Sequence, residues 1–277
     1  GCTQPRRIAA TSVAARVKEE IQDINDIVGY KIRFRDKTSK NSRIKFMTDG
    51  ILLTETKKDP LLKKYNILII DEAHERSLNI DFLLGYLKKI LSKRNNLKII
   101  ITSATIDTEI FSKHFFDAPV LNIEGRSFPV ETNYLPQPED GNEAELNLVE
   151  FCCTKTVQLL KKLPPGDMLV FLPTEKDIRQ CVDILKKKTD DFVILPMFGR
   201  LQSKDQANIF KTYHKRKIVV STNVAETSVT VPGIRYVIDS GLARISQYNP
   251  RAKTNSLPVT RISQSSCNQR KGRCGRI

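Results

Sequence analysis

The sequence predicts an α/β fold in which two parallel sheets follow one another along the chain, each flanked by helices. Short runs of large aliphatic residues recur without polar alternation, which is typical of strands that a parallel sheet buries on both faces. Between them lie longer segments whose apolar residues recur at helical spacing. The pattern occurs twice, on either side of a stretch with Gly, Ser and Pro at residues 125–129. We therefore expect one domain over residues 1–124 and a second over residues 125–277.

The first half opens on the end of a strand, which leads into an amphipathic helix at residues 8–21. Short strands are predicted at residues 31–34 and 43–47, and a helix begins at Thr48 and continues to about Glu55. The remaining predicted elements are a strand at 67–70, a helix at 81–92, a buried strand at 97–101, a helix at 107–116 and a strand at 120–123.

The second half repeats this alternation. Helices are predicted at residues 143–163, 175–188 and 202–213, and strands at 168–172, 192–195, 217–220 and 236–238. Strands that alternate with helices imply right-handed crossovers and a parallel sheet in each half.

Composition favours a folded, basic protein with a polyanionic partner. The 277 residues are 40% hydrophobic, which excludes a disordered chain. Lys and Arg outnumber Asp and Glu by 46 to 31, and the formal charge of +15 points to nucleic acid before membrane, because neither a lipid-anchor motif nor a basic amphipathic helix accompanies it. No apolar run is long enough to span a bilayer. The run of lysines at 186–188 is better interpreted as a solvated helix end than as a binding patch.

The six cysteines indicate neither a zinc site nor a disulfide framework. They include no C-x-x-C pair, and Cys152 and Cys153 are adjacent. A reducing cytoplasm fits this pattern best.

Asp71 and Glu72 stand directly after the aliphatic run at residues 67–70. In open α/β sheets ligands bind outside the carboxyl ends of the strands, so the pair is placed at a site edge. Adjacent carboxylates there suit Mg²⁺ that carries phosphate. The alternative is an acidic cap of the following helix, with His74 as a packed residue at its start.

The run at residues 269–276 carries an amide and several guanidinium groups. On a helix, Gln269, Arg273 and Arg276 share one face, while Gly272 and Gly275 leave another side bare for close backbone approach. Planar guanidinium groups held on one face suit a transferring phosphoryl group. The alternative is a plain basic surface.

Three further segments follow strands. Residues 222–233 form a long, small-residue loop whose hydroxyls and amides suit contact with a sugar-phosphate backbone. Residues 3–7 end in two arginines at a helix start, which is either a phosphate grip or a charged helix terminus. The hydroxyls of Ser103 and Thr105, taken alone, read best as a helix cap.

Together these segments resemble the motifs of a known family. Residues 3–7, 48–50, 71–74, 103–105, 171–174, 222–230 and 269–276 resemble, in order and spacing, motifs Ia, Ib, II, III, IV, V and VI of the superfamily 2 DEAH-box RNA helicases. Residues 224–236 and 262–264 look most like the bacterial HrpA type. The resemblance covers essentially the whole chain and implies two tandem RecA-like domains that hydrolyse ATP and step 3′ to 5′ along RNA.

The resemblance implies roles for individual residues at the nucleotide. Asp71 and Glu72 would hold Mg²⁺ through water, and Glu72 would orient or deprotonate the attacking water. Gln269 would help to position that water, while Arg273 and Arg276 would bear on the phosphates. Arg16 and Phe210 would sandwich the adenine, a stack that other NTPs can share.

It also implies roles in RNA binding and coupling. His74, itself part of the nucleotide site, would join Ser103 and Thr105 in coupling that site to RNA. The residues on family positions that touch the RNA backbone are Arg6, Arg7, Arg33, Thr48, Thr174 and Thr230. Residues 244–259 correspond to the β-hairpin thought to part the duplex.

One departure from the family pattern is serious. No G-x-x-x-x-G-K-[ST] loop occurs in the 277 residues, and the resemblance places it upstream of Gly1. The modules that the family carries after Arg276 are missing as well. We therefore expect an internal fragment that hydrolyses almost nothing by itself.

The other class of function is a catalytically inert RNA-binding scaffold. A zinc hydrolase built on His74 and Glu75 is excluded, because no second His follows at Leu78. We further expect a cytoplasmic monomer that binds no membrane, with DNA left open as a second nucleic acid.

Overall fold

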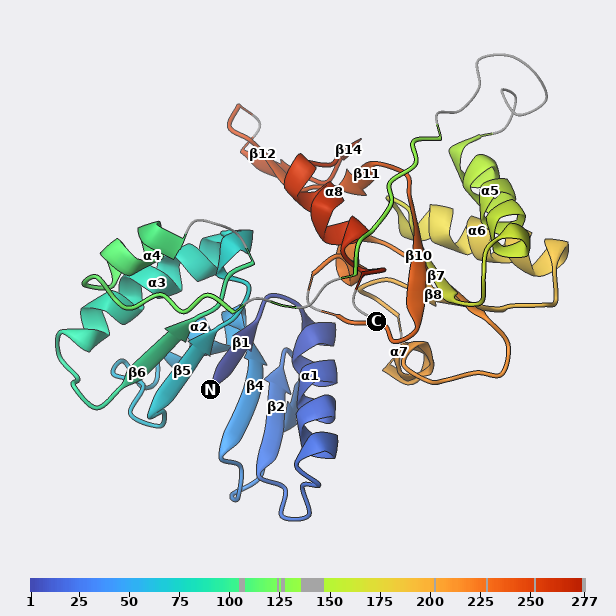
Figure 1. The fold of residues 1–277 in the computed structure, drawn as a ribbon. Helices are drawn as coiled ribbons and strands as arrows, with labels where there is room; N and C mark the ends of the chain where they lie inside the picture. The colour runs from blue at the N-terminus through green and yellow to red at the C-terminus, as the bar shows by residue number, and fades with distance from the viewer. Residues whose placement is uncertain are drawn as a thin grey trace. The chain divides into compact units, whose positions relative to one another are not determined.

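The structure, a computed structural model, describes residues 1–104, 108–123, 125, 128–135, 147–201, 203–227, 229–251 and 253–275. The chain divides into two compact units, Gly1–Glu124 and Gly125–Ile277 (Figure 1). Both are α/β, with parallel sheets flanked by helices, so the predicted fold class is confirmed.

The first unit is built on a six-stranded sheet in the order β3-β2-β4-β1-β5-β6. Its neighbouring strands are parallel except for β2 and β3, which form an antiparallel hairpin. The strands are β1 (Cys2–Gln4), β2 (Val28–Ile32), β3 (Arg35–Lys37), β4 (Ile44–Thr48), β5 (Ile67–Ile70) and β6 (Lys98–Ile101). The helices are α1 (Arg7–Glu20), α2 (Asp49–Glu55), the short 3₁₀ helix η1 (Ala73–Glu75), α3 (Leu78–Leu91) and α4 (Thr108–His114).

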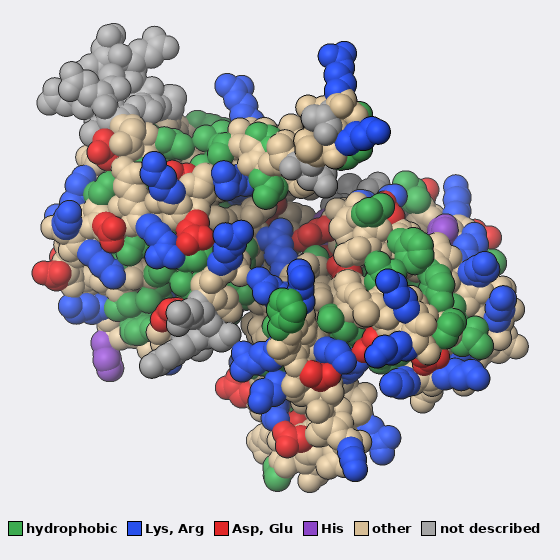
Figure 2. All heavy atoms as spheres, turned by 180° about the vertical axis from the view of Figure 1, so that it is seen from behind, with side chains coloured by type: hydrophobic (Ala, Val, Ile, Leu, Met, Phe, Trp, Pro, Cys, Tyr) green, Lys and Arg blue, Asp and Glu red, His purple; other side chains and the backbone are tan. Residues whose placement is uncertain are grey.

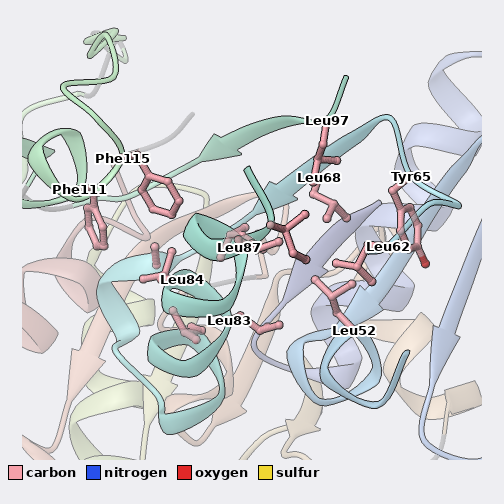
Figure 3. Close-up of a cluster of buried hydrophobic side chains, with 14 of the residues drawn as sticks. Leu52, Leu62, Tyr65, Leu68, Leu83, Leu84, Leu87, Leu97, Phe111 and Phe115 are labelled. Carbon is pink, nitrogen blue, oxygen red and sulfur yellow. The ribbon is translucent and has the colours of Figure 1, made fainter. Parts of the chain in front are cut away.

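Alternation along the strands divides the core of this unit between the two faces of the sheet. Leu68 and Ile70 of β5 point to the same face, where they join the larger core that α2, α3 and α4 cover (Figure 3). Ile69 points to the opposite face and packs with Phe46 against α1. Crossover helices on both faces thus leave the strand ends as the accessible edges of the sheet.

Three local predictions for this unit are wrong. Residues 31–34 span the end of β2 and its turn, because Phe34 adopts a left-handed backbone (φ +67°) that no strand accommodates. Residues 120–123 are exposed and form no strand. Strand β6 lies at the edge of the described sheet, so Ile100 is 49% exposed rather than buried.

The second unit contains a four-stranded parallel sheet in the order β10-β7-β9-β8. The strands are β7 (Asp167–Phe171), β8 (Val193–Met197), β9 (Lys217–Ser221) and β10 (Ile234–Asp239). The helices are α5 (Leu148–Lys162), α6 (Glu175–Lys188), α7 (Ser203–Ile209), the short 3₁₀ helix η2 (Asn223–Ala225) and α8 (Gln264–Lys271). Two antiparallel pairs follow the sheet: β11 (Leu242–Arg244) with β14 (Val259–Arg261), and β12 (Gln247–Asn249) with β13 (Thr254–Ser256).

The core of this unit lies between the sheet and the helix pair α5 and α6. Val170 of β7 and Val220 of β9 are fully buried there with Cys153 and Cys181. Helix α6 has the predicted bounds, whereas α7 ends at Ile209, four residues earlier than predicted. The predicted start of the first helix at Glu143 lies outside the described residues.

All six cysteines are free. Among the described residues, no helix combines the length and the hydropathy that a membrane span requires. No group of three His, Cys, Asp or Glu side chains suited to a metal ion is found in that part of the chain either.

Candidate functional site

Polar residues line the carboxyl edge of the first sheet in a defined order. Because β2, β4, β1, β5 and β6 are parallel neighbours, their last residues lie side by side, about 4.8 Å from strand to strand. The row begins at the turn after β2 and continues with Thr48, Gln4, Asp71 and Thr102 at the ends of the next four strands. Arg33 follows β2, Arg6 and Arg7 follow β1, and the adjacent acids Asp71 and Glu72 follow β5.

Asp71 is the most firmly held residue of the row. Its Oδ2 accepts a hydrogen bond from Gln4 Nε2 at 2.6 Å, and its Oδ1 accepts from the Thr102 hydroxyl and from the backbone N–H of Glu72. The donors come from both neighbouring strands, β1 and β6, so the register of the sheet fixes the carboxylate.

Glu72 adopts a left-handed backbone conformation, with φ 56° and ψ 39°. For a residue other than Gly this costs on the order of 1–3 kcal/mol, and such strain concentrates at functional sites. The consequence is a sharp turn directly after β5, which starts the short helix η1 and brings His74 back beside Glu72.

His74 links motif II to motif III. Its imidazole is buried, and its Nδ1 accepts a hydrogen bond from the backbone N–H of Ala104 at 3.2 Å. Nδ1 therefore lacks a proton in the neutral ring, and Nε2, which carries it, lies 3.4 Å from Glu72 Oε2. One imidazole thus connects the acidic pair to the segment that contains Ser103. Thr105 lies outside the described residues.

The helix-cap alternative for the acidic pair is wrong. Helix α3 begins at Leu78, and its cap is Ser77, whose side chain accepts a hydrogen bond from the backbone N–H of Ile80. Neither Asp71 nor Glu72 caps this helix. Both side chains lie instead at the carboxyl edge of the sheet.

The donor set suits a hydrated Mg²⁺ ion. A carboxylate offers about four lone-pair positions, and three acceptor contacts of Asp71 are occupied by protein donors. The remaining lone-pair position of Asp71 suits contact with an Mg²⁺ ion through a bound water better than coordination of the ion by protein groups alone. Mg²⁺ retains several of its waters in protein sites.

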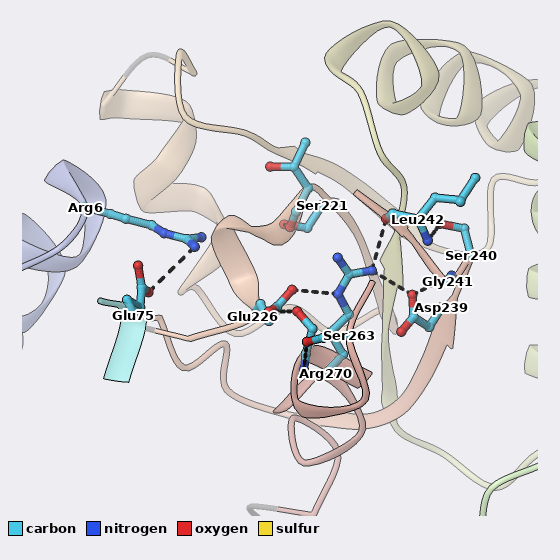
Figure 4. Close-up of polar contacts among 12 residues, drawn as sticks. Arg6, Glu75, Ser221, Glu226, Asp239, Ser240, Gly241, Leu242, Ser263 and Arg270 are labelled. Atoms are coloured by element: carbon cyan, nitrogen blue, oxygen red, sulfur yellow. Dashed lines mark hydrogen bonds and ion pairs between the residues drawn. The ribbon is translucent and has the colours of Figure 1, made fainter. Parts of the chain in front are cut away.

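Arg6 and Arg7 stand at the start of α1, with no acidic residue in the first turn of that helix. Two cations at a helix N-terminus oppose the helix dipole, so they do not serve helix stability. An ion pair of 3.7 Å between Arg6 Nη2 and Glu75 Oε1 holds Arg6 at the edge (Figure 4), whereas Arg7 is exposed. This arrangement favours an anionic ligand over a helix-capping role.

Thr48 and Arg33 occupy the β2 side of the row. Thr48 precedes α2, but its side chain makes no capping hydrogen bond. Arg33 is exposed, and its guanidinium lies 4.8 Å from the centre of the Phe34 ring. Thr48 therefore does not act as a helix cap, and Arg33 is not part of the core.

Asp49, directly after Thr48, is a buried carboxyl that sequence reasoning did not single out. It is 4% exposed, and its Oδ1 has no hydrogen-bond partner among the described residues. The pKa of Asp49 is raised to about 6, chiefly by burial; a hydrogen bond from Thr3 lowers it, and the nearby charges of Glu75 and Asp71 add to the rise.

In the second unit, a buried guanidinium ties the motif V loop to the motif VI helix. Arg270 on α8 is 1% exposed; its Nε donates to Glu226 Oε2 at 2.8 Å and its Nη1 to Asp239 Oδ1 at 2.7 Å (Figure 4). The guanidinium also lies 4.8 Å from the centre of the Phe171 ring, and the Ser266 hydroxyl donates to Glu226.

The predicted helical face of Gln269, Arg273 and Arg276 is wrong. Helix α8 ends at Lys271 with Gly272 as its C-cap, so Arg273 lies beyond the helix and does not share a helical face with Gln269. Beyond it the chain approaches Phe128, whose backbone N–H donates to the carbonyl of Gly275 at 2.9 Å. A side chain at Gly275 would lie 3.0 Å from the Phe128 carbonyl, so the predicted close approach at this glycine is confirmed.

Arg273 is buried, and its Nη1 donates to the backbone carbonyl of Val229 in the motif V loop at 3.1 Å. Gln269 is half-buried on α8. Arg276 lies outside the described residues. Motifs V and VI are thus joined both by Arg270 and by Arg273.

The remaining predicted residues are placed as follows. Thr174 caps α6, its hydroxyl engaged with Asp177 in a capping box, while Thr230 is exposed in the motif V loop. Arg16 lies nine residues into α1, about 14 Å along the helix, and pairs with Glu20 on the exposed surface. Phe210 is half-buried directly after α7.

Sequence reasoning missed the residues that position the site. Gln4, Thr102 and Arg270 each bind carboxylates 31 to 67 residues away, and local patterns do not report such distances. A signal existed for Glu226, which is the one acid in the otherwise uncharged loop at residues 222–233.

Comparison with known proteins assigns the same two regions. A family model described as DEAD/DEAH box helicase matches residues 3–112, and one described as helicase conserved C-terminal domain matches residues 152–277. The chain is 52% identical over its full length to the ATP-dependent RNA helicase HrpA of Escherichia coli and 45% identical to that of Borreliella burgdorferi. It is 46% identical to the pre-mRNA-splicing factor ATP-dependent RNA helicase prp22 of Schizosaccharomyces pombe.

The fold agrees with these matches. The crystal structure of the Escherichia coli DEAH/RHA helicase HrpB superposes with a TM-score of 0.90 and 36% identity over the whole chain, which covers 35% of that protein. The chain spans 21% of the Escherichia coli HrpA, 34% of the Borreliella burgdorferi protein and 24% of prp22. With its two units matched in order by the two helicase models, the chain belongs to the DEAD/DEAH box helicase family.

Proposed function

We propose that this chain is the motor core of an ATP-dependent RNA helicase, in which NTP hydrolysis drives 3′ to 5′ movement along RNA. The observation that carries the proposal is the anchored acidic pair: Asp71 is held by two neighbouring strands, and Glu72 is joined through His74 to the motif III segment. A passive RNA binder has no use for strained, precisely hydrogen-bonded carboxylates at this edge.

In the proposed reaction, Asp71 and Glu72 would hold a hydrated Mg²⁺, and that ion would offset negative charge on the phosphates of bound ATP. Glu72 orients or deprotonates the attacking water, and its left-handed backbone forms the sharp turn directly after β5. The His74 imidazole contacts both Glu72 and the backbone of Ala104. A movement of Glu72 caused by the nucleotide would therefore be transmitted to motif III.

The second unit would act on the same nucleotide. Gln269 would position the water, and Arg273 and Arg276 would stabilise charge on the transferring phosphoryl group. Arg273 Nη1 donates to the Val229 carbonyl in this structure. Because a guanidinium carries five N–H donors, Arg273 could contact a phosphate while it keeps this bond, which would couple catalysis to the motif V loop.

RNA would lie along the basic side of the row. Arg6, Arg7, Arg33 and Thr48 of the first unit, with Thr174 and Thr230 of the second, are the proposed backbone contacts, and the β12–β13 hairpin would part the duplex. The adenine contacts of Arg16 and Phe210, a monomeric state and a cytoplasmic location belong to the same proposal, which leaves DNA open as a second nucleic acid.

RNA-stimulated ATP hydrolysis by the full-length protein tests the proposal. Glu72→Gln should abolish turnover while RNA binding persists, because the substitution removes the base and preserves the shape of the side chain. Glu109→Gln, an exposed change on α4, is the matched control and should leave turnover unchanged. A wild-type protein that binds RNA yet hydrolyses no NTP would favour the inert scaffold instead.

Direction is tested separately with duplexes that carry a single-stranded extension on one strand. We expect unwinding of a duplex with a 3′ extension and little unwinding of one with a 5′ extension. The opposite preference would remove the proposed direction and leave the hydrolytic proposal intact.

A further inference from the structure

An exposed aromatic residue stands at the tip of the hairpin between β2 and β3. Ile32 pairs with Arg35, so Arg33 and Phe34 alone form the loop. The Phe34 ring is 92% exposed, and its backbone is left-handed, with φ +67°. Two-residue turns with positive φ at the second position favour Gly or Asn, because a bulky side chain is strained there.

Neither the turn nor the hydrophobic core explains Phe34. The residue is absent from the buried clusters of the described first unit, and its ring contacts the Arg33 guanidinium at 4.8 Å. The fold therefore holds a large aromatic side chain in solvent against the conformational preference of the turn. Strain and exposure leave the ring available to a ligand, and the position and charge of its neighbours decide whether a ligand binds there.

The charge around Phe34 identifies the class of ligand. Arg33 precedes Phe34 in the turn, with its guanidinium 4.8 Å from the centre of the ring, and Arg35 follows it at the start of β3, so two arginines flank the ring. An aromatic ring among cations is the arrangement by which proteins bind single-stranded nucleic acid, with the base stacked on the ring and the phosphates on the cations.

Phe34 also lies in line with the proposed RNA track. Its turn follows β2 at the carboxyl edge of the sheet, and β2 stands two positions from β1, after which Arg6 follows. Two strand spacings amount to about 10 Å. About three nucleotides at 3.4 Å each bridge this distance.

We propose that Phe34 is a stacking platform for one base of single-stranded RNA. Arg33 covers one face of the ring and is within reach of the adjoining phosphate, and the base occupies the other face. This inference rests on the proposed RNA-binding function and adds a base contact to a row of backbone contacts. Because every base has a π face, the platform is tolerant of sequence.

The test measures binding of a fluorescein-labelled 12-mer of oligouridine to the 277-residue chain. Phe34→Gly should weaken binding about 5- to 150-fold, the range found when a stacking aromatic is removed. The same change relieves the left-handed strain, so the thermal unfolding midpoint should stay constant or rise. Phe34→Trp should retain the affinity.

Phe116→Gly is the matched control. Phe116 is also exposed, at 64%, also has a positive φ of 59°, and also has a cation, Lys88, 5.3 Å from its ring centre. It lies after α4, outside the basic hairpin, and its removal should leave RNA affinity unchanged. Equal losses at Phe34 and Phe116 would overturn the proposal.

An oligomer of abasic sites separates stacking from phosphate contact. The wild-type chain should lose affinity for it, and Phe34→Gly should bind both oligomers equally. If wild type binds oligouridine in a salt-dependent manner and Phe34→Gly binds it equally well, the platform is refuted and RNA binding stands. If the wild-type chain binds neither oligomer, the stacking platform and the proposed RNA binding are both refuted. In that case, self-association in sedimentation that depends on Phe34 would assign the ring to a protein contact.

Discussion

Asp49 is a charged group that the fold buries without a full set of partners. Its orphaned Oδ1 and its pKa of about 6 describe the same fact, that the carboxylate form is poorly solvated where it sits. An unfolded Asp has a pKa of 3.8. Between pH values of about 4 and 6 the folded chain holds a proton that the unfolded chain has released, so stability falls as pH rises through this window.

Asp49→Asn should therefore stabilise the chain at neutral pH. A shift of about two pKa units corresponds to roughly 3 kcal/mol, which sets the order of magnitude of the gain at pH 7. The gain should vanish below pH 4, where the wild-type carboxyl is protonated in both states. Urea unfolding at several pH values measures it, with Asp183→Asn on the exposed face of α6 as control. A gain that is the same at pH 4 and pH 7 would contradict the assignment.

At the scale of elements, α8 is fastened to the rest of its unit through Arg270. The guanidinium forms ion pairs with two carboxylates, Glu226 in the motif V loop and Asp239 at the end of β10, and neither side chain is more than 19% exposed. Removal of the cation would leave both acids with little solvent and no countercharge.

Arg270→Met should lower the free energy of unfolding by about 3–5 kcal/mol, as for other buried ion pairs that lose one partner. The control is Arg179→Met on α6, where the partner Glu175 is exposed and the pair is worth at most about 1 kcal/mol. Chemical denaturation of both variants measures the contrast. Similar losses in the two variants would show that Arg270 acts through its bulk and not through its charge.

Helix α6 depends on its capping box. The Thr174 side chain accepts from the Asp177 backbone, and the Asp177 side chain accepts in return from the Thr174 backbone N–H at 3.1 Å. Thr174→Ala should cost about 1 kcal/mol of unfolding free energy, and Thr174→Ser should restore it. If the hydroxyl also contacts RNA, Thr174→Ala should weaken RNA binding at temperatures where the chain is still fully folded; a loss that tracks unfolding alone would confine Thr174 to the cap.

The elements that the sequence predicts well are those whose pattern is local. Strand β5 and helix α6 have the predicted bounds because an aliphatic run and a helical apolar stripe are contained within each segment. Residues 31–34 failed because the apolar Phe34 extends the pattern of β2 into its turn. Residues 120–123 have the same local pattern as a strand, but no neighbouring strand pairs with them in the described sheet.

The site divides in the same way. Asp71 and Glu72 are readable because they follow a strand, and the edge of a parallel sheet is where ligands bind. Arg270 stands in a run of basic residues that reveals nothing about burial, and its partners lie 44 and 31 residues away. The end of α8 at Lys271 was missed because a helix tolerates an interior glycine at a cost of about 1 kcal/mol, so Gly272 by itself does not mark a helix end.

For the whole molecule, positive charge is widespread rather than confined to the edge residues. The formal charge is +15, and Figure 2 shows Lys and Arg side chains scattered over the face in view, on both units. Net charge alone would attract any polyanion. The proposed RNA track requires more than net charge. It requires that Arg6, Arg7 and Arg33 contact phosphates, while most of the other basic side chains contribute only general electrostatic attraction.

Salt dependence distinguishes these cases. Each phosphate neutralised on a single strand contributes about −0.7 to the slope of log K against log salt, because counterions are released. Arg6→Ala and Arg33→Ala should each make the slope for oligouridine shallower by about 0.7. Lys186→Ala and Lys187→Ala, on the exposed last turn of α6, remove the same charge and should leave the slope unchanged. If all four variants shift the slope equally, RNA is held by net charge and the ordered row at the sheet edge is not its track.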